Sequence, residues 1–541
     1  MSNSLYSIAA PQNETVFDYS PGSPQRDLLV GELERQAGTT IDIPLIIGGQ
    51  EIRTGTTAAI TMPHDHTHTL GRYHQAGENE IRMAIEAALD AKAQWEALSW
   101  VDRATIALKA AQLISSTYRY ILNAATMLGQ SKNIFQAEID ATAELADFLR
   151  FNAHFMSGIY QNQPASTPDV INRSEYRALE GFVLAVTPFN FTAIAGNLCT
   201  APALMGNTIV WKPASTAVYS GYYLMQLFKE AGFPDGVINF VPCSGALMGS
   251  IALKDPHLAG IHFTGSTAVF QQMWRIVGEQ IQGYRSYPRI VGETGGKDFV
   301  VAHASAGVEA LCTGLVRGAF EYQGQKCSAA SRAYIPRSLW PALRRRLQAV
   351  LEEVTMGDPR SMEHLINALI DRDAFDRVMG YIEKARRSNQ AEILFGGHGD
   401  ATKGYFVEPT VIEVKDPAFI TMTEEIFGPV LSIYVYADEA YAEILELCDR
   451  TSPYALTGAV FATDRNAIAV AEKRLRHAAG NFYINDKPTG AVVGQQPFGG
   501  SRASGTNDKA GSMLNLLRWT SARTIKENLD PPTNYRYPFM D

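Results

Sequence analysis

The sequence predicts an α/β protein of two or three domains. The chain has 541 residues, which is long for a single domain. Strand-like and helix-like segments alternate between residues 207 and 281, which is typical of βαβ units in a parallel sheet. Further units of this kind follow between residues 291 and 515. Together these observations favour two α/β units joined in one chain.

The composition is that of a soluble globular enzyme, with 46% hydrophobic and 19% charged residues. The net charge is −9, and the basic run Arg344 to Arg346 lies inside a predicted helix. This balance argues against nucleic acid as the main partner. The five cysteines are scattered and include no CxxC pair, which predicts free thiols in a reducing compartment.

Two segments bear on location. Met1 to Ser20 has no basic residue and no apolar core, so it resembles neither a secretory signal nor a transit peptide, and we expect a cytoplasmic protein. No charged residue lies between Glu180 and Lys212, a length that could span a bilayer. Pro188 and Asn197 are among the residues that interrupt this stretch, which favours a buried strand, loop, helix and strand.

The first 40 residues are polar and predict an arm that wraps the body. Residues 43–60 alternate around Gly48 and Gly49, as in an early hairpin. His64, His66 and His68 would share one face of a strand, which raises a metal site as an alternative. No cysteine or glutamate partner follows from the spacing, so we predict an exposed loop or edge and no metal.

Helices are predicted next. Ile81, Ile85, Ala88 and Leu89 recur at helical spacing within residues 78–97, and further helix extends to about residue 160, including 136–155. The polar stretch 161–178 then interrupts the helical pattern. Strands are predicted at 181–186, 207–211 and 237–241, with a helix at 220–231.

A strand at 257–263 leads through Thr264, Gly265 and Ser266 into a helix at 268–281. A small-residue turn at a helix N-terminus offers free N–H groups and a favourable dipole, so it predicts an anion site suited to a pyrophosphate. The usual GxGxxG fingerprint is absent.

The second unit begins with the segment 289–301. Helices are predicted at 339–354 and 371–387, and a glycine-rich turn at 396–404. Residues 490–505 are again rich in glycine and small side chains, and 518–541 predict a terminal strand and tail.

Three polar residues suggest chemistry at a carbonyl carbon. Cys327 lies beside Lys326 and among small residues, and a cysteine attacks as a thiolate whose pKa nearby cations lower. Glu293 lies in a glycine-rich turn and could activate water. Asn190 in Thr-Pro-Phe-Asn-Phe could stabilise an oxyanion. Taken singly, a cysteine such as Cys327 is more often a buried packing residue, and a solvated loop acid is as ordinary a reading of Glu293 as a catalytic base.

These stretches occur in order with several others along the chain: Trp211-Lys212-Pro213-Ala214, Phe263-Thr264-Gly265-Ser266-Thr267, Glu424-Glu425-Ile426-Phe427-Gly428-Pro429 and Pro497-Phe498-Gly499-Gly500. The set resembles the aldehyde dehydrogenase superfamily from about residue 40 to 525. The resemblance implies the aldehyde dehydrogenase fold, with a Rossmann-like NAD-binding domain (1–160 and 180–290) and an α/β catalytic domain (291–515). Residues 161–179 and 516–541 would form a small β oligomerisation flap and a tail, in a homodimer or larger homo-oligomer.

The loop from Asp486 to Gly500, with Gln325-Lys326-Cys327-Ser328 and Gln136-Ala137-Glu138-Ile139-Asp140, resembles the pyrroline-5-carboxylate dehydrogenase branch. That branch oxidises L-glutamate γ-semialdehyde to glutamate in proline breakdown. By resemblance, Ser328 and the amides of Gly490 and Ala491 would hold the substrate carboxylate. Glu144 and Lys326 would set the polarity of the pocket, whereas an exposed helix carboxylate is the ordinary reading of Glu144. Phe191 and Phe498 would enclose the aliphatic chain.

The resemblance also implies the cofactor contacts. Lys212 and Glu425 would bind the riboses, Phe427 would lie beside the nicotinamide end, and Thr264, Gly265 and Ser266 would face the pyrophosphate. An acid at position 215 would repel the 2′-phosphate of NADP, but this chain has Ser215, so NADP stays open. NAD is expected because the branch that the chain resembles mostly uses it. Asp298 and Ser501 depart from the usual Asn and Ala, which alters only local polarity at the level of sequence.

The implied mechanism has Cys327 form a thiohemiacetal and then a thioester, Asn190 and the Cys327 N–H stabilise the oxyanion, and Glu293 activate water. Another semialdehyde dehydrogenase, acting for instance on succinate semialdehyde, is the nearest alternative. A CoA-acylating enzyme is disfavoured by Glu293, and a non-catalytic NAD-binding protein by the intact set of three. A redox-sensing role of Cys327 could accompany catalysis.

Overall fold

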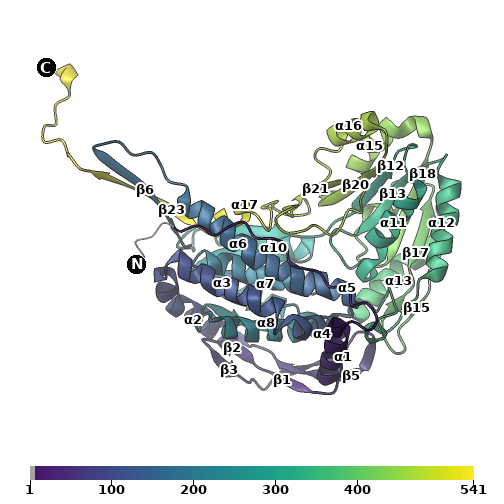
Figure 1. The fold of residues 1–541 in the computed structure, drawn as a ribbon, viewed down its shortest axis with the longest axis horizontal. Helices are drawn as coiled ribbons and strands as arrows, with labels where there is room; N and C mark the ends of the chain where they lie inside the picture. The colour runs from purple at the N-terminus through teal and green to yellow at the C-terminus, as the bar shows by residue number, and fades with distance from the viewer. Residues whose placement is uncertain (1–5, 541) are drawn as a thin grey trace.

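The structure is a computed structural model that describes residues 6–540. Two seven-stranded sheets form the centres of two layered bodies, and a two-stranded ribbon projects from them (Figure 1). Helices cover both sheets, as expected for mainly parallel strands that are buried on both faces. The predicted α/β class is confirmed.

The first sheet has the strand order β11-β10-β7-β8-β9-β2-β3. Its strands are β11 (Arg289–Glu293), β10 (Leu258–Thr264), β7 (Phe182–Val186), β8 (Thr208–Lys212), β9 (Ile238–Phe240), β2 (Leu45–Ile47) and β3 (Gln50–Ile52). The first five are parallel, whereas β2 and β3 form the predicted hairpin and pair antiparallel at the edge.

The two faces of this sheet bury alternate residues of β7. Val183 and Ala185 pack in the core with α3 (Trp100–Ser115), α4 (Arg119–Gln130), α6 (Glu144–Gln161), α7 (Thr192–Leu204) and α8 (Val218–Ala231). Phe182 and Leu184 pack on the other side with α2 (Glu78–Ala97), α9 (Gly245–Ala252) and α10 (Thr267–Glu279). Burial on both sides explains why residues 181–211 contain no charged side chain. Among the described residues, no helix combines the length and hydropathy needed to cross a membrane.

The second sheet has the order β14-β17-β18-β13-β12-β20-β21 and is parallel except for β14. Its strands are β14 (Ala391–Phe395), β17 (Thr410–Val414), β18 (Val430–Tyr436), β13 (Ala330–Pro336), β12 (Asp298–Ala302), β20 (Thr457–Phe461) and β21 (Asn481–Ile484). One face packs on α11 (Val308–Phe320) and α12 (Trp340–Glu353). The other packs on α13 (Arg372–Arg386), α15 (Tyr441–Arg450) and α16 (Arg465–Arg474). The chain crosses between the sheets at residues 294–297, directly after Glu293.

The predicted N-terminal arm is only partly an arm. Residues 6–20 are extended, but α1 (Pro24–Ala37) follows and buries Leu29 and Leu33. The helix had readable signals, since Ser23 accepts a hydrogen bond from the Arg26 N–H and Pro24 opens the first turn. Beyond it, β1 (Ile41–Ile43), β5 (Asp65–His74) and β4 (Thr57–Met62) form a three-stranded sheet.

The helix predicted over residues 136–155 is interrupted. A short α5 (Ile134–Ala137) runs into the π-helix η1 (Glu138–Ala143) before α6 begins at Glu144. A π-turn inside a helix re-aims the side chains that follow it, and such turns are frequent at functional sites.

The side chains of His64, His66 and His68 do not converge. His64 is buried and contacts Ser131 Oγ at 3.2 Å, whereas His66 and His68 hydrogen-bond to the carbonyls of Ala401 and Ala37. Across residues 6–540 no group of three or more His, Cys, Asp or Glu side chains could hold a metal ion.

The projecting ribbon pairs β6 (Val170–Arg177) with β23 (Ser521–Asn528) in antiparallel register. Figure 1 shows it standing away from both bodies, with the C-terminal tail continuing beyond it. Both strands carry mostly half-buried or exposed residues, so the ribbon has no core of its own.

Candidate active site

A cavity of about 740 Å³ opens where the carboxyl ends of the first sheet face the second body. Strands β7 and β8, the turn before α10 and helices α9 and α10 line it from one side, and Cys327, Arg377, Glu425 and Phe427 line it from the other. Binding at the carboxyl ends of parallel strands is the general rule for open α/β sheets. Eight of the residues predicted from sequence share this cavity: Asn190, Lys212, Thr264, Gly265, Ser266, Cys327, Glu425 and Phe427.

The turn before α10 has the geometry of an anion site. Ser266 is the N-cap of α10, where its Oγ accepts a hydrogen bond from the Val269 N–H at 3.4 Å. Thr264, Gly265 and Ser266 line the cavity, so the N-terminus of α10, where helical N–H groups lack partners within the helix, borders it. A side chain at Gly265 would collide with the Phe263 ring, 2.7 Å from an added Cβ. Glycine therefore keeps this turn compact.

Lys212 and Glu425 lie on opposite walls of the cavity. Burial lowers the pKa of Lys212, and its ammonium forms no ion pair among the described residues. Glu425 accepts a hydrogen bond from the Gly296 N–H at 2.9 Å, and burial raises its pKa. Phe427 adopts a left-handed backbone (φ 57°) that turns its ring against Phe189. Ser215 is exposed and lies outside the cavity lining, although its neighbour Ala214 is part of it.

The cavity suits a dinucleotide in shape and chemistry. One end is an apolar slot formed by Met248, Leu253, Val269 and Ile276, and the other end reaches Cys327. A planar base fits such a slot, and the middle supplies a helix N-terminus for phosphates together with a cation and a carboxylate. The residues present therefore fit NAD.

The segment before Cys327 is held in an unusual backbone. Tyr322 and Gln323 are left-handed (φ 50° and 54°), and so is Gly324, where an added Cβ would lie 2.2 Å from the Gly428 carbonyl oxygen. Tyr322 Oη donates to the Gln130 carbonyl, and Gln323 Nε2 donates to the Ser131 and Ala368 carbonyls. Backbone strain of this kind persists where surrounding contacts enforce it, and it clusters at active sites.

Asn190 lies close to the same loop. It is 4% exposed, and its Nδ2 donates to the Gln325 carbonyl at 3.0 Å. Its amide thus points toward the segment that carries Cys327, the arrangement required of an oxyanion donor.

Glu293 does not line the large cavity. Its carboxylate accepts a hydrogen bond from the Gly500 N–H at 3.2 Å, in the loop that follows Phe498. Burial raises its pKa well above the ordinary value, opposed by the Gly500 hydrogen bond and by the Lys509 cation. A carboxyl group with a raised pKa is suited to general-base work near neutral pH.

The electrostatic setting of Cys327 differs from the prediction. Burial raises the pKa of its thiol, and the carboxyl groups of Asp298, Glu293 and Glu425 raise it further. The expected cation is directed elsewhere, because Lys326 Nζ lies 3.5 Å from Glu321. The expectation that a cation lowers the pKa of Cys327 is therefore wrong, because the charged group of Lys326 lies against Glu321 although the two residues Lys326 and Cys327 are adjacent in sequence.

A second polar group surrounds Phe191 and Glu144. Lys132, absent from the sequence-based list, is fully buried, forms an ion pair with Asp140, and lies over the rings of Phe191 and Tyr322 (4.3 and 4.5 Å). Burial and the Asp140 charge raise the pKa of Glu144, whereas Lys132 and Lys326 oppose the rise. Glu144 is therefore no ordinary exposed carboxylate. The sequence around Lys132 gives no sign of this position, because its ring contacts are with Phe191 and Tyr322, which are distant in sequence.

The remaining predicted substrate residues lie around the loop 486–500. Ser328 Oγ contacts Thr489 Oγ1 at 2.7 Å, directly before Gly490, which is left-handed (φ 92°), and Ala491. Lys487 Nζ reaches Glu321 at 3.2 Å, so Glu321 joins this loop to Lys326. Phe498 bridges to Ala510 through paired backbone hydrogen bonds. None of the seven predicted substrate residues lines the large cavity, and Cys327 adjoins Lys326 and Ser328 at its border.

Comparisons with known proteins identify the same family as the sequence motifs. The model of a family described as "Aldehyde dehydrogenase family" matches residues 52–525. The mitochondrial delta-1-pyrroline-5-carboxylate dehydrogenase of Dictyostelium discoideum is 53% identical, covering 98% of this chain and 96% of that protein. The mitochondrial enzyme of the same name from Bos taurus is 49% identical, covering 98% and 94%. The delta-pyrroline-5-carboxylate dehydrogenase of Mycobacterium tuberculosis, solved with NAD bound, is 52% identical with a TM-score of 0.97, covering 100% of each chain.

The expectation of a cytoplasmic location is contradicted by these comparisons. Both of the eukaryotic relatives above are named mitochondrial proteins. The prediction rested on the composition of residues 1–20, of which 1–5 lie outside the described residues. Composition over so short a segment does not determine the compartment.

Proposed function

This chain belongs to the aldehyde dehydrogenase family, and from this premise we propose that it oxidises L-glutamate γ-semialdehyde to L-glutamate with NAD. The semialdehyde is the open form of 1-pyrroline-5-carboxylate, so the reaction belongs to proline degradation. The observation that carries the proposal is the position of Cys327, between a cavity that fits NAD and a buried cluster of opposite charges. Relatives that carry the corresponding name match nearly the whole chain.

Cys327 is the nucleophile. Its Sγ bonds to the aldehyde carbon, and the aldehyde oxygen becomes the oxyanion of a thiohemiacetal. The Asn190 amide and the Cys327 N–H stabilise that oxyanion, and removal of one such donor lowers the rate by about a hundredfold or more. The thiol proton passes to a neighbouring carboxylate. When bound, NAD takes up the two electrons and the hydrogen that leave the aldehyde carbon.

Glu293 then completes the reaction. The thioester on Cys327 needs an activated water, and Glu293 takes a proton from that water. Water attack breaks the bond between carbon and Sγ, which releases glutamate and returns the Cys327 thiol. The Gly500 N–H holds the carboxylate by a hydrogen bond, the Lys509 cation favours its ionised form, and burial keeps it basic.

The charged end of the substrate binds beyond Cys327. Ser328 and the amides of Gly490 and Ala491 hold the α-carboxylate, and a nest of backbone N–H groups suits an anion. Glu144 faces the α-ammonium, and Lys132, Lys326 and Asp140 keep that side polar. Phe191 and Phe498 enclose the methylenes, whose burial contributes about 0.8 kcal/mol each.

The cofactor contacts follow the walls of the cavity. Thr264, Gly265 and Ser266 receive the pyrophosphate at the N-terminus of α10, Lys212 and Glu425 bind the riboses, and Phe427 lies at the nicotinamide end. Ser215 carries no charge and leaves the adenosine ribose side open. In this assignment residues 1–160 and 180–290 bind NAD and residues 291–515 carry the catalytic groups.

The chain forms a homo-oligomer, at least a homodimer, through the ribbon of β6 and β23. Two-stranded ribbons are marginally stable alone, and this one exposes Ile171 (43%) and Leu529 (55%). A second copy of the chain would cover these side chains.

The test compares NADH formation from glutamate semialdehyde and from succinate semialdehyde, which lacks an α-ammonium. We expect a preference for the former of about tenfold or more in kcat/KM. Equal or reversed preference would leave the family intact and overturn the substrate.

The same assay with Cys327→Ser tests the nucleophile, and Cys312→Ala, in the buried α11, is the matched control. We expect Cys327→Ser to abolish turnover and the control to retain it. Full activity of Cys327→Ser would rule out the mechanism.

A further inference from the structure

The extended N-terminal segment follows α6 in the reverse direction. Ile8 hydrogen-bonds to His154 and Ser157, Glu14 to Asp147, and Phe17 to Glu138. The segment is thus seated along the whole of α6 and η1, the elements that carry Glu144. Figure 1 shows the dark purple chain crossing these helices before α1 begins.

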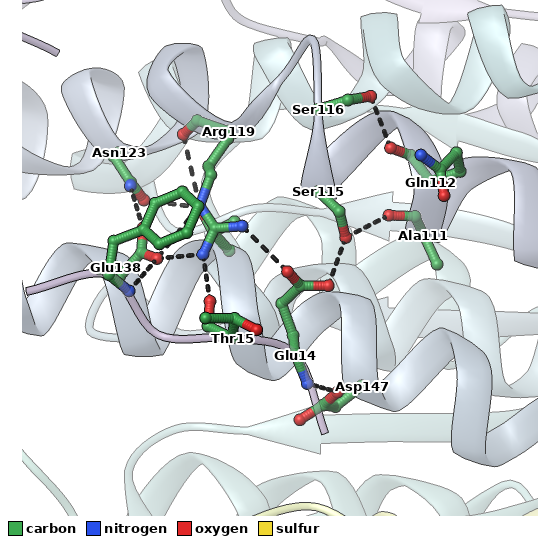
Figure 2. Close-up of polar contacts among 12 residues, drawn as sticks. Glu14, Thr15, Ala111, Gln112, Ser115, Ser116, Arg119, Asn123, Glu138 and Asp147 are labelled. Atoms are coloured by element: carbon green, nitrogen blue, oxygen red, sulfur yellow. Dashed lines mark hydrogen bonds and ion pairs between the residues drawn. The ribbon is translucent and has the colours of Figure 1, made fainter. Parts of the chain in front are cut away.

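Its middle is fixed by buried charge. Glu14 accepts hydrogen bonds from Arg119 (2.9 Å) and Ser115 (2.6 Å), and its own N–H donates to Asp147 at 2.7 Å (Figure 2). It also accepts a hydrogen bond from Arg150 at 2.5 Å. Arg119 in turn pairs with the fully buried Glu138. Removal of one partner from such a network leaves an uncompensated buried charge, so the segment is held firmly.

Asn13 connects this segment to a distant loop. Its Nδ2 donates to Asp147 Oδ2 and to the Val493 carbonyl, both at 2.8 Å, and its Oδ1 accepts from Gln495 Nε2 at 2.8 Å. One side chain therefore joins α6 to the loop that begins with Gly490 and Ala491.

The loop itself has few other attachments at this point. Val493 packs against Phe148 and Phe151 of α6, and Gly494 is left-handed (φ 82°) with the Phe151 ring 2.2 Å from an added Cβ. Among the described residues, the hydrogen bonds of Val492 stay within the loop and go to Gln495 and Gln496. Asn13 therefore supplies hydrogen bonds to this loop, whereas α6 supplies its apolar contacts.

We propose that residues 13 and 14 form a strap that sets the distance between α6 and the loop 490–496, and that Asn13 is a positioning residue for recognition of the charged end of the substrate. The strap acts on both sides of that end, because Asp147 lies one helical turn after Glu144 and Val493 lies two residues after Ala491. It does not touch Cys327 or the NAD cavity. The proposal rests on the proposed function, in which Glu144, Gly490 and Ala491 bind the substrate.

The experiment compares wild type with Asn13→Ala and Asn13→Asp on two five-carbon substrates, glutamate semialdehyde and pentanal. Pentanal shares the aldehyde and chain length but lacks both charged groups. Loss of three hydrogen bonds should raise KM for glutamate semialdehyde by about five- to twentyfold, with kcat within about twofold. Asn13→Asp should have at least as large an effect, because its carboxylate would face Asp147. For pentanal, kcat/KM should stay within about twofold of wild type.

Gln161→Ala is the matched control. It removes a contact of the same segment with the same helix, the 3.4 Å hydrogen bond to the Tyr6 carbonyl, at the end remote from the loop. It should leave KM for both substrates unchanged. Equal losses on both substrates in Asn13→Ala, or no loss on either, would overturn the proposal.

Amide hydrogen exchange gives a readout that does not depend on the substrate. Exchange in residues 490–496 should be faster in Asn13→Ala than in wild type or Gln161→Ala, and unchanged rates there would overturn the strap. A wild type that does not prefer glutamate semialdehyde to pentanal would instead overturn the proposed function, while the exchange rates would still decide the strap.

Discussion

Asp298 is a buried carboxyl group beside the reactive loop. It is 2% exposed, its Oδ1 accepts from the Thr457 N–H at 2.6 Å, and its Oδ2 has no hydrogen-bond partner among the described residues. A Cβ built on Gly296 would lie 2.2 Å from both this Oδ2 and the Cys327 carbonyl oxygen. Burial raises the pKa of Asp298 to about 8. The residue therefore does more than alter local polarity, because its charge acts on Cys327.

Asp298→Asn should make Cys327 more reactive at alkaline pH. Ionised Asp298 raises the thiol pKa, and the carboxyl becomes ionised as pH rises through about 8. Asparagine carries no charge, so in the variant the pKa of the Cys327 thiol is lower than in wild type at alkaline pH. Alkylation by iodoacetamide should be within about twofold of wild type at pH 7 and at least about threefold faster at pH 9.

Glu309→Gln is the control for this measurement, because Glu309 is exposed and acts on Cys312 instead. It should leave the alkylation of Cys327 unchanged. A ratio between Asp298→Asn and wild type that does not grow with pH would contradict the assigned effect.

At the scale of elements, β10, the turn and α10 act as one unit. The strand ends at Thr264, Ser266 caps the helix, and the first turn of α10 faces the cavity. The cap has two roles, since it satisfies a helix N–H and leaves other N–H groups for phosphate. These roles can be separated by substitution.

Ser266→Asp and Ser266→Asn both retain a good N-cap, but only Asp adds a negative charge at the proposed pyrophosphate site. We expect Ser266→Asp to raise KM for NAD by about tenfold or more, and Ser266→Asn by less than about threefold. Both should keep Tm close to that of wild type. Similar KM values for the two variants would show that the pyrophosphate does not approach this turn.

At the scale of the whole molecule, the ribbon of β6 and β23 has a position and an exposure that contacts within one chain do not explain. It projects from the body in Figure 1 and exposes apolar side chains near its tip. Ile171 lies opposite Glu527, two residues before Leu529, so both apolar residues lie at one end of the ribbon. Contact with a second copy would explain this exposure.

The double variant Ile171→Asp/Leu529→Asp should shift the mass in solution from an oligomer toward a monomer, because two charges cannot be buried unpaired in an interface. Light scattering after size-exclusion chromatography measures this. Val470→Asp, at an exposed position of α16, is the control and should leave the mass unchanged. An unchanged mass in the double variant would remove the ribbon from the interface.

Much of the fold could be predicted from the sequence. The helix at Glu78–Ala97, the strands around Val183 and Ile209 and the turn at Gly265 follow from periodicity, burial pattern and small residues. The candidate site residues came from ordered motifs, and the structure places eight of them in one cavity. Helix α1 is not predicted, because the first 40 residues are polar overall and the N-cap signal at Ser23 and Pro24 is short.

The class of the fold, most of its helices and strands, and the side chains available for chemistry follow from the sequence, because these are properties of short contiguous segments. Only the tertiary structure decided that carboxyl groups and not a cation surround Cys327, that Lys132 lies over Phe191, and that Asn13 reaches Val493. The physical reason is that desolvation and charge act through space, between residues that the chain brings together from positions far apart in sequence.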